Sequence, residues 1–223
     1  MQKIVIIGNS ISADIMYAYL KKDERYHVVA FAVDREFIKE KNKFELPVVE
    51  LNKLSTMYST LEHKIILAVG YNKINKVRAE IFNRIRDMGY VMETYIHPKA
   101  QIYTDIKIGD GSVILGGSII EPYATIGENS IIWANCVIGH HSKVGNNCWI
   151  ASGTVVAGEA TVGNNSFLGV NATVSNQVNV GAFNIVGGNT AIHRNTKDNE
   201  VYLSSHGEKH RFSATDYDQY YLK

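Results

Sequence analysis

The 223-residue chain lacks the features that mark membrane, secreted and nucleic-acid-binding proteins. No apolar run approaches the roughly 18 residues that a membrane-spanning helix needs. Residues 1–10 carry one lysine and a short apolar run, without the longer apolar stretch and small-residue cleavage site of a secretory signal. The net charge is only +1, so no bulk electrostatic attraction to nucleic acid or to a membrane is expected. We therefore expect a cytoplasmic protein with neither kind of partner.

An aliphatic residue recurs at every sixth position in the second half of the chain. From Ile96 to Ile192 all seventeen such positions are Ile, Val or Leu. A fixed short period is typical of repeat architectures, in which each unit packs against its neighbours. Six is neither the helical period nor strand alternation, and it places one large inward side chain on each flat face of a coil. The series predicts a parallel β-helix with eighteen residues per turn and coils about 4.8 Å apart.

The position four residues after each aliphatic residue is mostly small, as the crowded corners of a triangular prism require. Cysteine is scarce, and the only two, Cys136 and Cys148, both occupy this position. Because they are twelve residues apart, they fall on different faces of the predicted coil. We interpret them as buried small apolar side chains and not as a disulfide.

Residues 1–93 follow a different pattern, in which strands alternate with helices. This alternation predicts a small Rossmann-like parallel sheet that binds ligands at the carboxyl ends of its strands. The helical segments carry apolar residues at the spacing of an amphipathic helix. The expected strands are 3–7, 27–33 and 64–69, and the expected helices are 11–22 and 72–88.

Candidate ligand-binding residues follow each of the three predicted strands. The loop Gly8-Asn9-Ser10-Ile11-Ser12 follows the first strand, Asp34 the second, and residues 70–72 the third. The first loop is not the full G-x-G-x-x-G of a dinucleotide site. Its glycine turn and the amides of the following helix N-terminus suit one phosphate group or a mononucleotide. A plain strand-to-helix turn is the alternative interpretation.

Two adjacent histidines stand at one corner of the predicted coil. In an eighteen-residue turn, His140 stacks below Gly158 and His141 stacks below Glu159. We expect the glycine to leave open space for a ligand beside His140, and the glutamate to set the tautomer of His141. An imidazole is the natural general base near neutral pH. A solvated pair of surface histidines is the alternative.

The coil lacks a metal-binding pattern. The β-helix carbonic anhydrases resemble this fold, and they bind zinc through histidines across a trimer interface, including one shortly after another ligand. Residues 142–192 contain no histidine, so we expect no metal.

The repeat sequences IGENSII, VGNNCWI and VGNNSFL, at 126–132, 144–150 and 162–168, resemble those of the left-handed β-helix acyltransferases with hexapeptide repeats. Three further segments restrict the resemblance to one group of these acyltransferases: the opening KIVIIGNS, the join Ile96-His97-Pro98 and the corner CVIGH at 136–140. Over about residues 2–195 the chain resembles the nucleotide-sugar N-acetyltransferases of the bacillosamine and perosamine pathways, and the sialic acid O-acetyltransferase-like group.

This resemblance implies a homotrimer that binds acetyl-CoA, as co-substrate, in the groove between adjacent coils. It also implies that the N-terminal domain binds a nucleotide-linked amino sugar. The catalytic base falls on His140, with His141 and Glu159 as candidate orienting groups. The implied coenzyme A wall is Gly158, Val170, Gly187 and Gly188, and the implied substrate-binding residues are Gly8, Ser10, Ser12, Asp34, Gly70 and Asn72.

The chain departs from the family pattern at several positions. His141 stands where an acidic residue is common, and Ser12 where the first loop often carries a histidine. Trp149 replaces a second histidine and Trp133 a polar residue, which predicts an altered acceptor or acyl pocket or, equally, packing at the trimer interface. The usual Gly-x-Pro-Ala segment after the last coil is missing, and residues 202–206 (YLSSH) take its place.

We therefore predict three parts, an α/β nucleotide-sugar-binding domain (1–93), a left-handed β-helix acyltransferase domain (94–195) and a C-terminal tail (196–223). The predicted reaction is N-acetylation of a nucleotide-linked 4-amino-4,6-dideoxy sugar, and the resemblance implies a role in polysaccharide biosynthesis. A sialic acid-type O-acetyltransferase and a non-catalytic β-helix binding protein are the alternatives. The residues alone do not identify the sugar, the nucleotide or the acyl chain.

Overall fold

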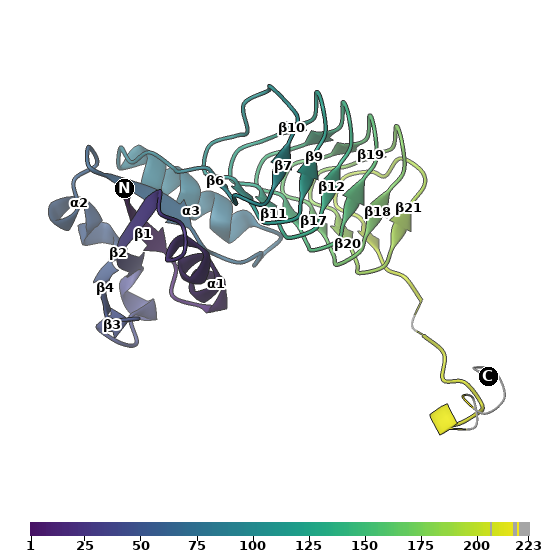
Figure 1. Ribbon diagram of the computed structural model, residues 1–223, viewed down its shortest axis with the longest axis horizontal. Helices are drawn as coiled ribbons and strands as arrows, with labels where there is room; N and C mark the ends of the chain where they lie inside the picture. Colours follow the sequence, from purple (N-terminus) through teal and green to yellow (C-terminus); the bar gives the residue numbers. More distant parts are fainter. Residues whose placement is uncertain (206, 216–217, 219–223) are drawn as a thin grey trace.

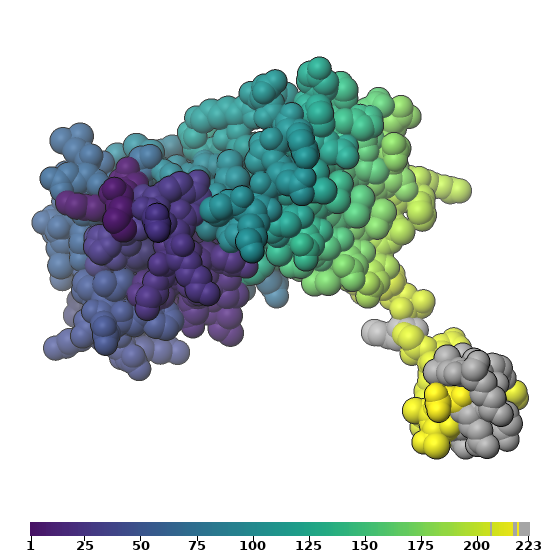
Figure 2. Space-filling view, viewed as in Figure 1, coloured from purple at the N-terminus to yellow at the C-terminus, as the bar shows by residue number. Residues whose placement is uncertain are grey.

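A computed structural model describes residues 1–205, 207–215 and 218 of the chain. A small α/β domain packs against one end of a long coil of short strands, and the two form one continuous body (Figures 1 and 2). After the coil, the described part of the tail extends away from this body (Figure 1). No helix among these residues is long and apolar enough to cross a membrane.

The α/β domain is built on a five-stranded sheet of order β3-β4-β2-β1-β5, in which only the edge strand β3 is antiparallel. The inner strand β1 lies between β2 and β5 and is covered on both faces, so Ile4 to Ile7 are almost completely buried. The strands are β1 (Gln2–Ile7), β2 (Tyr26–Val33), β3 (Asn42–Lys43), β4 (Leu46–Glu50) and β5 (His63–Leu67). The helices are α1 (Ile11–Leu20), α2 (Leu54–Met57) and α3 (Lys76–Asp87), with 3-10 turns η1 (Arg35–Phe37) and η2 (Leu51–Lys53).

The sequence pattern placed the second long helix at 72–88, but α3 begins four residues later, at Lys76. Lys73, Ile74 and Asn75 all adopt the left-handed conformation, with φ between 51° and 61°. Left-handed residues do not extend a right-handed helix, so the segment before Lys76 is a loop. The hairpin of β3 and β4 was also not predicted.

The coil is a left-handed parallel β-helix, as predicted, and its two-residue strands form three sheets that we call faces A, B and C. Face A contains β6 (Tyr95–Ile96), β8 (Val113–Ile114), β11 (Ile131–Ile132), β14 (Trp149–Ile150), β17 (Phe167–Leu168), β20 (Ile185–Val186) and β22 (Val201–Tyr202). Face B contains β7 (Gln101–Ile102), β9 (Ile119–Ile120), β12 (Val137–Ile138), β15 (Val155–Val156), β18 (Thr173–Val174) and β21 (Ala191–Ile192). Face C contains β10 (Thr125–Ile126), β13 (Lys143–Val144), β16 (Thr161–Val162) and β19 (Asn179–Val180).

The six-residue period becomes the core of the coil. In each strand the second residue points inward, and from Ile108 to Ile192 these aliphatic residues are 0–7% exposed. Residues eighteen apart pair in register, as Ile132 does with Ile150. Cys136 and Cys148 are free and fully buried among them, which confirms their interpretation as small apolar side chains.

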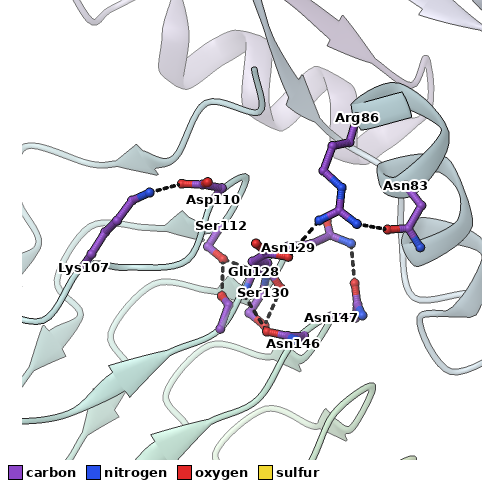
Figure 3. Close-up of polar contacts among 11 residues, drawn as sticks. Asn83, Arg86, Lys107, Asp110, Ser112, Glu128, Asn129, Ser130, Asn146 and Asn147 are labelled. Atoms are coloured by element: carbon purple, nitrogen blue, oxygen red, sulfur yellow. Dashed lines mark hydrogen bonds and ion pairs between the residues drawn. The ribbon is translucent and has the colours of Figure 1, made fainter. Parts of the chain in front are cut away.

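Three corners join the faces. Corner AB includes residues 133–136 and 151–154, corner BC includes 139–142 and 157–160, and corner CA includes 127–130 and 145–148. At corner CA, side chains bond from one coil to the next, because the backbone N–H of Glu128 donates to Asn146 and the amide of Asn129 donates to Asn147 (Figure 3).

The α/β domain covers the first coils of face A, whereas Val201 on the last strand of this face is exposed. The outward side chains of Val113, Ile131 and Trp149 share one buried cluster with Ile6 and Met16 of the α/β domain. The outward residues of faces B and C are not part of this cluster. Faces B and C therefore do not contribute to the contact with the α/β domain.

Candidate functional site

Corner BC carries unfavourable residue types at a strained backbone position. From Ile108 to Val186, the third residue after each inward aliphatic residue is left-handed, a conformation that favours asparagine and glycine. The other two corners use these two types at almost every coil. Corner BC instead stacks Tyr123, His141, Glu159 and Gln177, with φ between 57° and 65°. Four residues that are strained in this conformation stand in one column, which indicates that their side chains serve a function.

The imidazole of His140 is exposed at this corner and is held by three neighbours. Its Nδ1 lies 3.3 Å from Nδ1 of His141, so one of the two rings donates and the other accepts. Its backbone N–H donates to the carboxylate of Glu121 at 2.7 Å. Its ring packs against Gly158, where an added Cβ would lie 2.5 Å from Nε2. The expected open space above His140 is therefore wrong, because the ring itself occupies it.

The groups expected to orient His140 are arranged differently from the prediction. The ring of His141 packs against Tyr123, with centroids 4.7 Å apart and planes 32° apart. The carboxylate of Glu159 accepts a hydrogen bond from the side chain of Gln177 at 3.3 Å, and its backbone N–H donates to the carbonyl of His140 at 2.8 Å. A role for Glu159 through His141 thus stays a prediction. The eighteen-residue spacing places Tyr123 next to His141, as observed, whereas Glu121 was not among the residues that the sequence singled out.

A cavity of about 200 Å³ in the α/β domain collects five of the six predicted substrate-binding residues. Strand ends and the following loops bring them together at one edge of the parallel sheet. Val77 and Ile81 of α3 supply an apolar wall. A Cβ on Gly8 would lie 2.6 Å from the carbonyl oxygen of Ala68, so only glycine fits there. The five residues are Gly8, Ser10, Asp34, Gly70 and Asn72.

Charged side chains border this cavity. The carboxylate of Asp34 pairs with Arg84 of α3 at 2.5 Å. On the other side of the Gly8 turn, Lys43 donates to the carbonyl oxygen of Asn9 at 3.0 Å and pairs with Asp14 at 2.6 Å. Because Asp14 balances the charge of Lys43, it is the amides at the start of α1 that make the Gly8 turn favourable for an anionic group.

Ser12 does not join the cavity. It lines a separate space of about 20 Å³ between α1 and face A, beside Trp133 and Trp149. The first turn of α1 rotates Ser12 away from Gly8, towards the coil.

The two tryptophans pack between the domains of one chain. Trp149 points outward from face A and is 6% exposed, with its ring 5.0 Å from that of Tyr71 and 5.4 Å from that of Trp133. Neither ring reaches corner BC. Trp149 thus packs under the α/β domain of its own chain. Trp133 lies at corner AB and is half-buried, so an altered acceptor or acyl pocket and packing at the trimer interface both stay predictions for it.

The predicted coenzyme A residues fall on two different corners. Gly158 lies at corner BC, under His140, whereas Val170, Gly187 and Gly188 lie at corner AB. Val170 is 53% exposed there. One protomer does not bring the two groups together. At the far end of the coil, Tyr202 belongs to β22, and His206 lies outside the described residues.

The part of the chain that the structure describes contains no cluster of three or more His, Cys, Asp or Glu side chains that could hold a metal ion.

The coil matches known families by sequence. Residues 105–140 and 141–176 match the bacterial transferase hexapeptide family of six repeats, and residues 159–194 match the hexapeptide repeat of succinyl-transferase. Residues 105–194 thus form a left-handed β-helix that matches the hexapeptide-repeat transferase families, which confirms the resemblance that the repeat sequences predicted. No curated protein matches the chain by sequence.

Solved structures match almost the whole chain. A variant of perosamine N-acetyltransferase from Caulobacter crescentus, in complex with CoA and GDP-perosamine, is 25% identical with a TM-score of 0.83, over 92% of this chain and 94% of that one. The acetyltransferase domain of PglB from Neisseria gonorrhoeae is 21% identical with a TM-score of 0.82, over 92% and 97%. WeeI from Acinetobacter baumannii is 15% identical with a TM-score of 0.78, over 92% and 97%. The α/β domain and the coil together thus have the architecture of hexapeptide-repeat acetyltransferases.

Proposed function

We propose that the protein transfers the acetyl group of acetyl-CoA to the amino group of a nucleotide-linked 4-amino-4,6-dideoxy sugar. The observation that carries this proposal is the likeness over 92% of the chain to perosamine N-acetyltransferase, solved with CoA and GDP-perosamine. The exposed imidazole at corner BC and the cavity at Gly8 support it from this chain's own residues. In this proposal the protein acts in the cytoplasm, in the synthesis of a surface polysaccharide.

His140 is the proposed general base. When Nδ1 of His140 carries the hydrogen and donates a hydrogen bond to Nδ1 of His141, the lone pair on Nε2 of His140 is free to accept a proton. The amine nitrogen attacks the thioester carbonyl carbon while Nε2 takes the amine proton. Backbone amides stabilise the developing oxyanion. The C–S bond then breaks, and the imidazolium returns its proton to the departing thiolate of coenzyme A.

The proposed acceptor site is the cavity at the sheet edge. The Gly8 turn and the first amides of α1 suit the diphosphate, and the apolar wall of Val77 and Ile81 suits the base and ribose. A volume of about 200 Å³ holds part of a nucleotide, so the sugar would extend from the cavity towards the coil.

A homotrimer would complete the proposed coenzyme A site. The outward residues of face B include Ile119, Val137 and Val155, which are apolar and only half-buried in one protomer. Face C instead presents Thr125 and Lys143. Burying face B around a threefold axis would place corner BC of one protomer against corner AB of the next, and such a head-to-tail contact closes into a ring. Gly158 would then face Val170, Gly187 and Gly188 of the neighbouring protomer.

An acceptor panel tests the proposal. Acetyl-CoA is offered with UDP-, dTDP- and GDP-linked 4-amino-4,6-dideoxy sugars and with sialic acid, and release of free thiol is followed. We expect thiol release with at least one amino sugar nucleotide and none with sialic acid. Release with sialic acid alone would establish the O-acetyltransferase alternative. No release, together with no thermal stabilisation by saturating acetyl-CoA, would instead favour a non-catalytic binding protein.

His140→Ala tests the general base. Loss of proton transfer should lower turnover by roughly 10²–10⁴ while the trimer survives, because the ring is on the surface and outside the core. His27→Ala is the matched control, since His27 is an exposed histidine of the α/β domain far in sequence from corner BC. Turnover is measured with the best acceptor of the panel and assembly by light scattering. Unchanged turnover in His140→Ala would remove this imidazole from the mechanism.

A further inference from the structure

Arg78 is a buried cation between the two domains. Its side chain is 0% exposed, and one amino group of the guanidinium donates to the carbonyl oxygens of Asn147 and Cys148 at 2.8 and 3.1 Å. The other donates to the side-chain oxygen of Asn75 at 2.8 Å. The guanidinium also lies over the ring of Trp149, 5.6 Å from its centroid. Every recorded contact is thus with a neutral group, and two of them are backbone carbonyls at corner CA of the coil.

Asn75 forms the second half of this contact. It is 0% exposed, and its side-chain amide donates to the carbonyl oxygens of Asn165 and Ser166 at 3.0 and 3.3 Å. These carbonyls belong to the next coil after those that Arg78 contacts. To reach them the chain adopts three left-handed residues in a row, including Ile74 with φ 53°. A β-branched residue is a genuine outlier there, so the loop accepts strain to reach the coil.

Joining two domains through a buried guanidinium costs free energy. Burial lowers the pKa of Arg78 to about 10, which still leaves the guanidinium charged at neutral pH. A buried charge with no carboxylate partner costs free energy that an apolar side chain of similar size avoids. What a guanidinium offers over an apolar residue is a rigid plane of donors with fixed directions. Its hydrogen bonds therefore specify where the domain sits on the coil.

The same loop and helix build the nucleotide cavity. Gly70 and Asn72, on the loop that ends at Asn75, line the cavity, and so do Val77 and Ile81 on either side of Arg78. Two turns further along α3, Arg84 pairs with Asp34 at the cavity rim. One rigid element therefore holds the coil through Arg78 and the cavity through Val77, Ile81 and Arg84.

We propose that Arg78 is a positioning residue that fixes the height of the nucleotide cavity along the coil, so that a bound acceptor amine reaches the imidazole of His140. This role rests on the proposed function. In a trimer whose threefold axis is parallel to the β-helix axis, neighbouring protomers have no offset along that axis. Fixing the cavity on its own coil thus also fixes it against the His140 of the next protomer.

The test compares Arg78→Met and Arg78→Lys with wild type and with Arg86→Met. Arg86 lies on the same helix and pairs with Glu128 of the coil, 3.3 Å away on the exposed surface (Figure 3). Four quantities are measured for the trimeric enzyme: kcat, KM for each substrate, the Kd of the free nucleoside diphosphate, and the melting temperature. The acceptor is the one that the panel identifies.

We expect Arg78→Met to lower kcat by about tenfold to a hundredfold, because an ångström of misplacement costs this much in an oriented reaction. The KM for acetyl-CoA and the Kd of the nucleoside diphosphate should stay unchanged, since neither site is rebuilt. Arg78→Lys keeps the charge but only part of the donor geometry, and should recover part of kcat. Arg86→Met should match wild type in all four quantities.

Other outcomes would overturn this role. A lower melting temperature with unchanged kcat in both Arg78 variants would make the residue merely structural. If weaker binding of the nucleoside diphosphate accounts for the whole loss of turnover, Arg78 maintains the shape of the cavity and not its position. If Arg78→Met does not fold, Arg78→Lys decides, and full kcat in it rejects the role. A wild type that acetylates no panel member contradicts the proposed function itself, which is a different result from an active wild type with active Arg78 variants.

Discussion

At the scale of single residues, the candidate site depends on what the left-handed corner positions tolerate. At corner BC the left-handed positions form a column of four larger residues, Tyr123, His141, Glu159 and Gln177. The equivalent positions at the other two corners are mostly asparagine or glycine. This exception is visible in the sequence once the six-residue register is known, and it predicts the location of the histidine pair. The hydrogen-bond partners were not predictable, because side-chain direction at a corner depends on neighbours eighteen residues away. Glu121 bonding to the backbone of His140 is such a case.

Gly158→Ala tests the position of the His140 imidazole against Gly158. The new Cβ would lie 2.5 Å from Nε2 and 2.6 Å from Cε1 of His140, so the ring has to rotate away. The side chain is exposed and can move at little cost in stability, so we expect turnover to fall roughly as far as in His140→Ala, by 10² or more, with an unchanged melting temperature. Gly207→Ala is the control, because nothing lies within 4 Å of a Cβ there. Near-normal turnover in Gly158→Ala would show that the ring position at Gly158 is not the reactive one.

At the scale of elements, the coil was predictable and the domain contact was not. Each strand and corner repeats the same environment every six residues, so the inward and small positions follow directly from the sequence. Outward positions have no such period, because what covers them is set by tertiary packing. Trp149 therefore could not be placed, although its size suggested a site. The start of α3 was missed for a related reason, since Asn75 is held in a left-handed conformation by carbonyls of the coil.

Ala160→Leu tests the small position of the corners. Ala160 is 0% exposed in the core of the coil, where a larger side chain has no free volume. Overpacking should lower the free energy of unfolding by about 1–3 kcal/mol. Lys143→Leu is the control, because Lys143 points outward from face C and is exposed. Urea unfolding is followed at one fixed protein concentration, since assembly contributes to stability. Equal midpoints for both variants would contradict the view that prism corners limit side-chain size.

At the scale of the whole molecule, the three faces of the coil have different surroundings. The first coils of face A are covered by the α/β domain, whose helix α3 also reaches corner CA through Arg78. In the proposed trimer, the apolar outer surface of face B contacts a neighbouring protomer. Such a contact would bring Gly158 together with the group at Val170, which are separated within one chain. The proposed base at corner BC would then lie at the edge of this contact.

Val137→Asp tests whether face B joins the protomers. Val137 points outward from β12, between corner AB and the histidine corner, and a carboxylate buried there would have no partner. Such a charge costs about 3 kcal/mol or more per contact, which weakens assembly by roughly 10² or more. Because the proposed coenzyme A residues would meet only across the proposed contact, turnover should fall with the trimer fraction and recover as protein concentration rises. Lys143→Asp, one strand further on face C, is the control and should stay trimeric and active. Light scattering and turnover are measured over the same dilution series. A Val137→Asp protein that remains trimeric at every concentration would move the contact to another face, and a monomer with full activity would show that one protomer suffices for acetyl transfer.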